Sequence, residues 1–253
     1  MFPDLTSATW AAVVVVAALA GFVKGSVGFG MPMIMISGLG SLLDPKLALA
    51  ALLIPTALSN GLLAFRDGLA AAAASAKKFK RYILIVLLMI VVSSQLVNVI
   101  ATNTLFLLIG IPVVVFATLQ LAGLRLPLTP DNRRSADFAL GGAAGFFGGI
   151  SGVWGPPTVL YLTSLETPKK EQMRVQGIVY GLASIALVAA HIGSGVLNPR
   201  TAPFSALLVV PGLIGIALGF KLSNALNQAL FRKVTLVVLI IAGLNLLRRG
   251  IAG

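Results

Sequence analysis

The chain has 253 residues, of which 58% are hydrophobic and only 10% are charged, a composition that excludes an ordinary soluble globular domain. Apolar stretches fill almost the whole sequence, which predicts a polytopic membrane protein. Most lysines and arginines lie between these stretches, so the formal net charge of +12 indicates topology and contact with anionic lipid, not a nucleic-acid partner, and the lack of cysteine excludes disulfides and zinc–thiolate sites.

The first half of the chain, residues 1–124, is predicted to be an N-terminal transmembrane repeat of five apolar helices. The first two are short, since fourteen residues of helix reach about 21 Å against about 30 Å of hydrocarbon. We expect that neither spans the membrane alone, and that the two form either a broken span or a re-entrant hairpin. The five predicted helices cover residues 10–23, 31–43, 46–65, 82–100 and 104–124.

A polar and basic segment with two prolines, residues 125–137, is predicted to be a cytoplasmic linker. The rest of the chain, residues 138–253, is predicted to be a C-terminal transmembrane repeat. Its helices again include two short ones followed by three long ones, which indicates an internal repeat. They cover residues 138–149, 156–165, 175–197, 203–226 and 229–247.

The same glycine-rich motif opens both halves. GFVKGSVGFGMP (residues 21–32) aligns with GFFGGISGVWGPP (residues 145–157) when one residue is inserted. Because proline suits the first turn of a helix, half-helices are predicted to start at Pro32 and at Pro156 or Pro157. Their free N–H groups and positive dipole ends would point back at the glycine-rich breaks, and two such ends facing one small volume would attract an anion.

The two repeats can be parallel or inverted in the membrane. A broken span in each half gives an even number of crossings and a parallel repeat, whereas a hairpin gives an odd number and an inverted repeat. The inverted arrangement gathers more of the lysines and arginines on one side, so the positive-inside rule favours it, with both termini outside. We therefore expect an all-α membrane protein with two inverted repeats, each made of two short half-helices and three transmembrane helices.

Lys24 is the residue of the first motif that most needs an explanation, because a charge within an apolar stretch is costly. All seven acids fall at segment ends or in loops, so we expect the counter-charge of Lys24 to be a transported anion. Ser26 and Ser151 could donate hydroxyls to that anion, and glycines let it approach the backbone. The complete predicted substrate site is Lys24, Ser26, Phe29, Gly30, Ser151, Gly152, Trp154 and Gly155.

These residues also have a purely structural interpretation. Glycines such as Gly141, Gly145 and Gly149 can serve close helix packing, and Lys24 can extend toward an interface. The one histidine, His191, is expected near a segment end, bonded to backbone or headgroups, with a proton relay as the alternative. Other polar residues of the long segments, Asn60 and Tyr180 among them, are interpreted mainly as contacts between helices, with one or two of them lining the transport path as the alternative.

The chain resembles the TauE/SafE sulfite exporter family, also called the toluenesulfonate uptake permease family, in its two glycine-rich motifs and in the order of its apolar segments. The resemblance implies a multi-pass secondary transporter of sulfite, sulfonates or other small anions in the bacterial inner membrane. Two inverted halves predict alternating access around a midplane site, and we expect no cofactor and no metal. The departures are Lys24 and Phe29 in the first motif and Val153 with Trp154 in the second, and they leave the identity of the anion open.

The membrane potential favours export of an anion, and coupled uptake of an organic anion is the alternative within transporters. Two other classes are a membrane-embedded enzyme and a non-transporting membrane subunit. The chain offers little for an enzyme, since it contains one histidine and no cysteine. The sequence does not address oligomeric state, so a homodimer is compatible with it.

Overall fold

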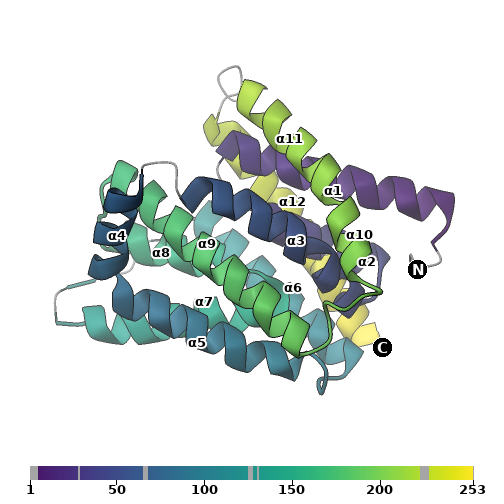
Figure 1. Ribbon diagram of the computed structural model, residues 1–253, viewed down its shortest axis with the longest axis horizontal. Coiled ribbons are helices and arrows are strands. Elements are labelled where there is room, and N and C mark those ends of the chain that lie inside the picture. The colour runs from purple at the N-terminus through teal and green to yellow at the C-terminus, as the bar shows by residue number, and fades with distance from the viewer. Residues whose placement is uncertain are drawn as a thin grey trace.

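The computed structural model describes residues 5–27, 29–64, 68–124, 128–129, 131–222 and 228–252, and this part of the chain is all helical, as predicted. Twelve helices are formed by the described residues (Figure 1). They are α1 Ser7–Val27, α2 Met31–Leu42, α3 Pro45–Ala64, α4 Leu69–Lys78, α5 Lys80–Leu96, α6 Thr102–Leu121, α7 Arg133–Ser151, α8 Gly155–Ser164, α9 Lys169–Gly193, α10 Ala202–Leu207, α11 Val209–Leu222 and α12 Gln228–Ala252.

Five helical stretches in the described residues are long and apolar enough to cross a bilayer. Four of them are α1, α6, α9 and α12, and the fifth is Ala202–Leu222, which combines α10 with α11. The pair α4 and α5 would make a sixth, although the two helices are bent by 84° where they meet. The chain is therefore a multi-pass membrane protein, as its composition predicts.

The predicted first segment of each half is too short. Residues 10–23 belong to α1, whose 21 residues extend about 31 Å, so the expectation that this segment cannot span alone is wrong. Residues 138–149 belong to α7, which has 19 residues and begins at Arg133, inside the predicted linker. An apolar segment read from the sequence ends at the first polar residues. The helix itself continues through these residues wherever their side chains find hydrogen-bond partners.

The second segment of each half is a half-helix, as predicted. Helices α2 and α8 have 12 and 10 residues, about 18 Å and 15 Å, with proline in the first turn of each. Gly30 precedes α2 with φ 94°, and Gly152 ends α7 with φ 75°. These positive φ angles favour glycine, so the glycines of the motifs make the chain turn between the long helix and the half-helix.

Two of the predicted long segments are divided. The predicted helix 82–100 ends at Leu96, and it is preceded by α4, an alanine-rich helix that the apolar segments do not include. The predicted helix 203–226 is divided into α10 and α11 at Leu208. The other long helices begin and end within six residues of their predicted bounds, and the largest difference is at the start of α9.

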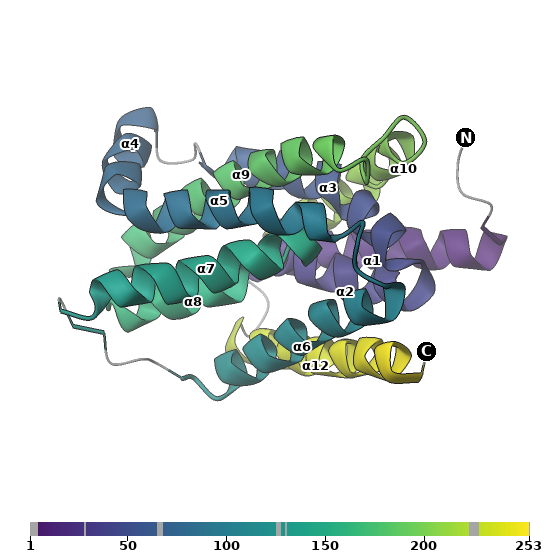
Figure 2. The ribbon, with the colours of Figure 1, turned by 90° about the horizontal axis from the view of Figure 1, so that it is seen from below.

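Helices from opposite halves pack side by side throughout the bundle. Helix α1 packs on α11 and α5 packs on α7, each pair running in the same direction, whereas α3 and α9 run antiparallel, as do α6 and α12 (Figures 1 and 2). The first turn of α1 and the last turn of α12 lie at the same end of the molecule.

Glycines let the two parallel pairs approach closely. A Cβ atom added to Gly21 of α1 would lie 2.0 Å from the carbonyl oxygen of Gly212 in α11, and one added to Gly215 would lie 2.0 Å from that of Ala18. In the other pair, a Cβ on Gly145 of α7 would lie 2.5 Å from the carbonyl oxygen of Val86 in α5. The packing interpretation of the glycines therefore holds for these positions.

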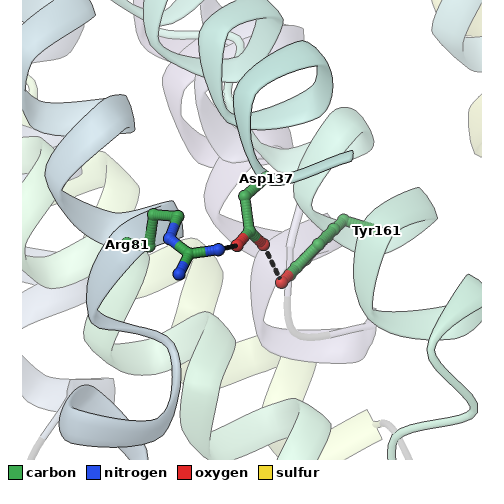
Figure 3. A network of polar contacts seen from close by, with 3 residues as sticks. All are labelled: Arg81, Asp137 and Tyr161. Atoms are coloured by element: carbon green, nitrogen blue, oxygen red, sulfur yellow. Dashed lines mark hydrogen bonds and ion pairs between the residues drawn. The ribbon is translucent and has the colours of Figure 1, made fainter. Parts of the chain in front are cut away.

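A polar cluster ties α5, α7 and α8 together at one end of the bundle (Figure 3). Asp137 of α7 is buried, its Oδ2 lies 3.4 Å from Nη1 of Arg81 in α5, and its Oδ1 accepts a hydrogen bond from the hydroxyl of Tyr161 in α8. The ring of Tyr161 stacks on Tyr82, whose hydroxyl donates to Oγ1 of Thr158 at 3.0 Å. This cluster fixes one face of the half-helix α8.

Replacing Asp137 with alanine is expected to lower the thermal unfolding midpoint in detergent by several degrees. The change leaves the buried Tyr161 hydroxyl without its acceptor, which costs about 1–3 kcal/mol. Lys78→Gln is the control, because it breaks an exposed ion pair with Glu171 (2.7 Å) of the kind that contributes at most about 1 kcal/mol. Equal shifts for both variants would contradict the prediction.

Candidate functional site

The two glycine-rich breaks meet at one small cavity in the middle of the chain's fold. Lys24, Phe29 and Gly30 line it from the first break, and Gly152, Trp154 and Gly155 line it from the second. A Cβ added to Gly152 would lie only 3.5 Å from the Cβ of Pro32 at the start of α2. Thus six of the eight predicted site residues, from positions more than a hundred residues apart, surround one cavity. Its other lining residues are Pro32, Met33, Asn60 and Tyr180.

The cavity measures about 20 Å³, which is room for about one water molecule. Sulfite, with four heavy atoms, needs more space. Binding of such an anion therefore requires a lining side chain or half-helix to move, and the conformation described is a closed one around Lys24.

The ammonium group of Lys24 has only neutral partners among the described residues. Its side chain extends from α1 toward α3, where Nζ donates a hydrogen bond to Oγ of Ser59 at 2.7 Å and another to Oδ1 of Asn60. Lys24 is 3% exposed, so it does not reach an interface. An ammonium group carries three N–H bonds, and these two contacts leave one for a ligand in the cavity that Lys24 lines.

Hydrogen bonds continue from Lys24 across the bundle to α9. The Nδ2 group of Asn60 donates to Oγ of Ser184 at 2.7 Å, and the Ser184 hydroxyl donates to the carbonyl oxygen of Tyr180. Ser59 donates to the carbonyl oxygen of Thr56 at 3.1 Å. Each hydrogen bond of this chain is donated in the direction away from Lys24, and none of the acceptors is an acidic residue.

Sequence reasoning left the parts played by Asn60 and Tyr180 open and did not single out Ser59 and Ser184. The adjacent polar pair Ser59–Asn60 in an otherwise apolar helix was the available signal. Which face of α3 this pair occupies depends on the antiparallel contact between α3 and α9, and that contact joins residues more than a hundred positions apart.

Ser26 and Ser151 are close to the breaks but do not line the cavity. The hydroxyl of Ser26 donates to the carbonyl oxygen of Gly219 in α11 at 3.4 Å, and that of Ser151 donates to Phe147 in its own helix at 2.7 Å. Both hydroxyls thus bond to backbone in the closed conformation. Their role as donors to an anion stays a prediction.

His191 lies near the end of α9 and is bonded to backbone, as expected from the sequence. Its Nε2 atom is 2.8 Å from the carbonyl oxygen of Gly149, and its Nδ1 atom is 3.1 Å from Oγ of Ser194. The ring is buried outside the cavity lining. It connects α9 to α7 immediately before the second break.

The geometry agrees with what comparison with known proteins shows. The family model described as Sulfite exporter TauE/SafE matches residues 13–246, which include both breaks and every residue that lines the cavity. The chain belongs to the TauE/SafE sulfite exporter family. No curated protein and no solved structure was found to match it.

Membership of the TauE/SafE family makes the chain a transporter by class and disfavours an enzyme. Within the described residues, no group of three or more histidines, cysteines and acids could hold a metal ion. The paired motifs precede the two half-helices, and they differ at Lys24, since Gly148 stands at the matching position of the second motif.

Proposed function

We propose that this TauE/SafE protein is a secondary transporter of small sulfur-containing anions, sulfite or an organosulfonate, and that the cavity around Lys24 is its substrate site. The observation that carries the proposal is the position of the Lys24 ammonium group. It is buried beside the starts of two half-helices and bonded only to neutral side chains of α3.

The electrostatics of this cavity favour an anion. Taking an ammonium ion out of water costs several kcal/mol, which neutral hydrogen-bond partners repay only in part. The half-helices α2 and α8 add the partial positive charge of their N-termini, about half a unit each. A bound anion would balance this charge, and the cavity lining contains no carboxylate that would repel it.

Alternating access between two inverted repeats is the proposed mechanism. The helix directions support it: α3 and α9, which occupy the same place in the two halves, run antiparallel, and so do α6 and α12 (Figures 1 and 2). The pair α1 and α11 is matched by the pair α7 and α5 when the halves are exchanged. Such an arrangement can present one central site to each side of the membrane in turn.

Export is the favoured direction of transport. An inside-negative membrane potential drives a singly charged anion outward with about 2.3 kcal/mol per 100 mV, so export needs no coupled ion. Uptake of an organic anion would need coupling to another gradient. The cavity lining contains no carboxylate to carry a proton for such coupling.

Flux into liposomes tests the proposed function. The purified protein, reconstituted without other proteins, should carry sulfite or a small organosulfonate at a rate that depends on the imposed membrane potential, and the same anion should raise its thermal unfolding midpoint. Sulfate and acetate serve as comparison anions. Folded protein that neither carries nor is stabilised by any sulfur-containing anion would rule the proposal out.

An internal counter-ion should inactivate the site. Asn60→Asp places a carboxylate where Lys24 Nζ now bonds to the amide oxygen, so the ammonium group becomes paired permanently. We expect anion flux to fall at least about tenfold and anion-induced stabilisation to disappear. Ser184→Ala is the control, because it breaks the same chain of hydrogen bonds without adding charge. Wild-type flux in Asn60→Asp would show that the anion does not bind next to Lys24.

A further inference from the structure

A larger groove of about 340 Å³ lies between α6, α8 and α12. Its wall on α8 is formed by Pro156, Val159, Leu160 and Thr163, and its wall on α12 includes Lys233. We propose that this groove is the vestibule through which the anion passes between the Lys233 end of the molecule and the Lys24 cavity. The inference rests on the proposed function and adds a route to the site.

Continuity along the chain connects the vestibule to the cavity. Pro156 lines the vestibule, and the residue before it, Gly155, lines the cavity. The two spaces therefore both border the first turn of α8, and a movement of this turn would join them.

Helix α8 is anchored on one face and borders the vestibule on the other. Pro156, Val159, Leu160 and Thr163 follow the spacing of a single helix face. Thr158 and Tyr161 lie on a different face and bond to α5 and α7 through Tyr82 and Asp137. The polar cluster of Figure 3 thus holds α8 in place by one face, while another face of α8 borders the vestibule.

The other half-helix is covered at the corresponding place. Helix α2 packs against both α6 and α12, whereas α8 packs against α6 and, among the described residues, has at most a weak contact with α12. The space that separates α8 from α12 is the vestibule. In the described conformation the open space next to a half-helix is therefore on the α8 side, whereas α2 is covered by α12 at the corresponding place.

The chemistry of the lining indicates an organosulfonate as the occupant. Among the described residues, Lys233 is the charged residue that lines the vestibule, and a cation there raises the local concentration of anions. The remaining walls are largely apolar, with Leu160 and Leu236 on facing helices. An organosulfonate can place its apolar part against these walls, whereas sulfite has only oxygens, which lose hydration there without gaining partners.

Single thiols test the route directly, because the chain contains no cysteine of its own. Leu160→Cys lies on the vestibule wall and Thr163→Cys is a near-isosteric change further along the same face. In liposomes, a negatively charged, membrane-impermeant methanethiosulfonate should react with both thiols from one side only and reduce organosulfonate flux to near background. An organosulfonate such as ethanesulfonate should slow the reaction at Leu160→Cys.

The matched control is Leu69→Cys on α4, which is exposed and outside the vestibule, so its reaction should leave flux unchanged. Lys233→Gln should lower flux at low ionic strength and much less at high ionic strength, and Lys221→Gln on α11 should not. Flux is compared only among variants whose thermal unfolding midpoints are equal.

Full flux after complete reaction of both vestibule thiols would overturn the proposal that the groove is the route of the anion. Failure of both thiols to react from either side of the membrane would overturn it as well. Absence of flux in the unmodified protein would instead overturn the proposed function. In that case, the rate at which the Leu160→Cys thiol reacts still decides whether the groove binds the anion. A slower reaction in the presence of ethanesulfonate supports binding in the groove, and an unchanged rate overturns it.

Discussion

Lys24→Met is expected to lower anion flux at least about tenfold while leaving the unfolding midpoint unchanged or higher. Methionine has nearly the length of lysine and removes the charge, so the anion loses its one full counter-charge and a charge-assisted hydrogen bond worth about 1.5–3 kcal/mol, which is a factor of roughly ten to a hundred. The closed protein gains by losing a buried cation that has only neutral partners, and this gain is offset in part because the buried Asn60 Oδ1 atom loses its donor at a cost of about 1–3 kcal/mol. Liposome flux and thermal unfolding in detergent measure the two effects.

Two further variants sharpen this result. Lys80→Met removes an exposed cation from α5 and should leave flux unchanged, which separates a local effect from a change in overall charge. Lys24→Arg keeps the charge, but the planar guanidinium cannot reproduce the contacts of the ammonium group with Ser59 and Asn60, so flux should stay low. Full flux in Lys24→Met would remove this residue from the substrate site.

Gly145→Ala is expected to destabilise the protein strongly. The new Cβ would lie 2.5 Å from the carbonyl oxygen of Val86 and 2.5 Å from the Cβ of Met89, and the first of these is backbone, so α5 and α7 must separate. Overpacking of this kind costs about 1–3 kcal/mol, occasionally more. We expect a large drop in unfolding midpoint or failure to accumulate in the membrane.

Gly142→Ala, in the same helix, is the control for Gly145→Ala. A Cβ there meets nothing within 4 Å, so the change should be neutral or stabilise the helix by up to about 1 kcal/mol. Gly21→Ala should behave like Gly145→Ala, since its Cβ would lie 2.0 Å from the carbonyl oxygen of Gly212. Similar midpoints for the variants at 142 and 145 would contradict the described contact between α5 and α7.

The half-helices were predictable because their signals are local. Glycines followed by proline mark the starts of α2 and α8, and both predicted segments agree with the structure to within one residue. The lengths of α1 and α7 were not predictable from hydropathy. Helix α1 passes through Lys24, which is satisfied by α3, and α7 begins with a turn whose Asp137 is satisfied by α5 and α8.

The site was predictable in part for the same reason. The residues that come from the breaks themselves, such as Phe29 and Trp154, follow from the repeated motif. Asn60 and Tyr180 come from α3 and α9, and only the packing of these helices against the breaks brings them to the cavity. The hydroxyls of Ser26 and Ser151 can bond either to a ligand or to nearby carbonyls, and sequence does not choose between these rotamers.

The glycine contact between α1 and α11 has a consequence for biosynthesis. Helix α1 enters the bilayer early, yet the partner that covers its small-residue face is translated about 190 residues later, which at 5–20 residues per second is roughly 10–40 s. Until then that face can meet only lipid or insertion machinery. A nascent chain arrested before α11 should accordingly expose α1 to crosslinking, and separate expression of residues 1–124 should yield a fragment that cannot mature without the rest.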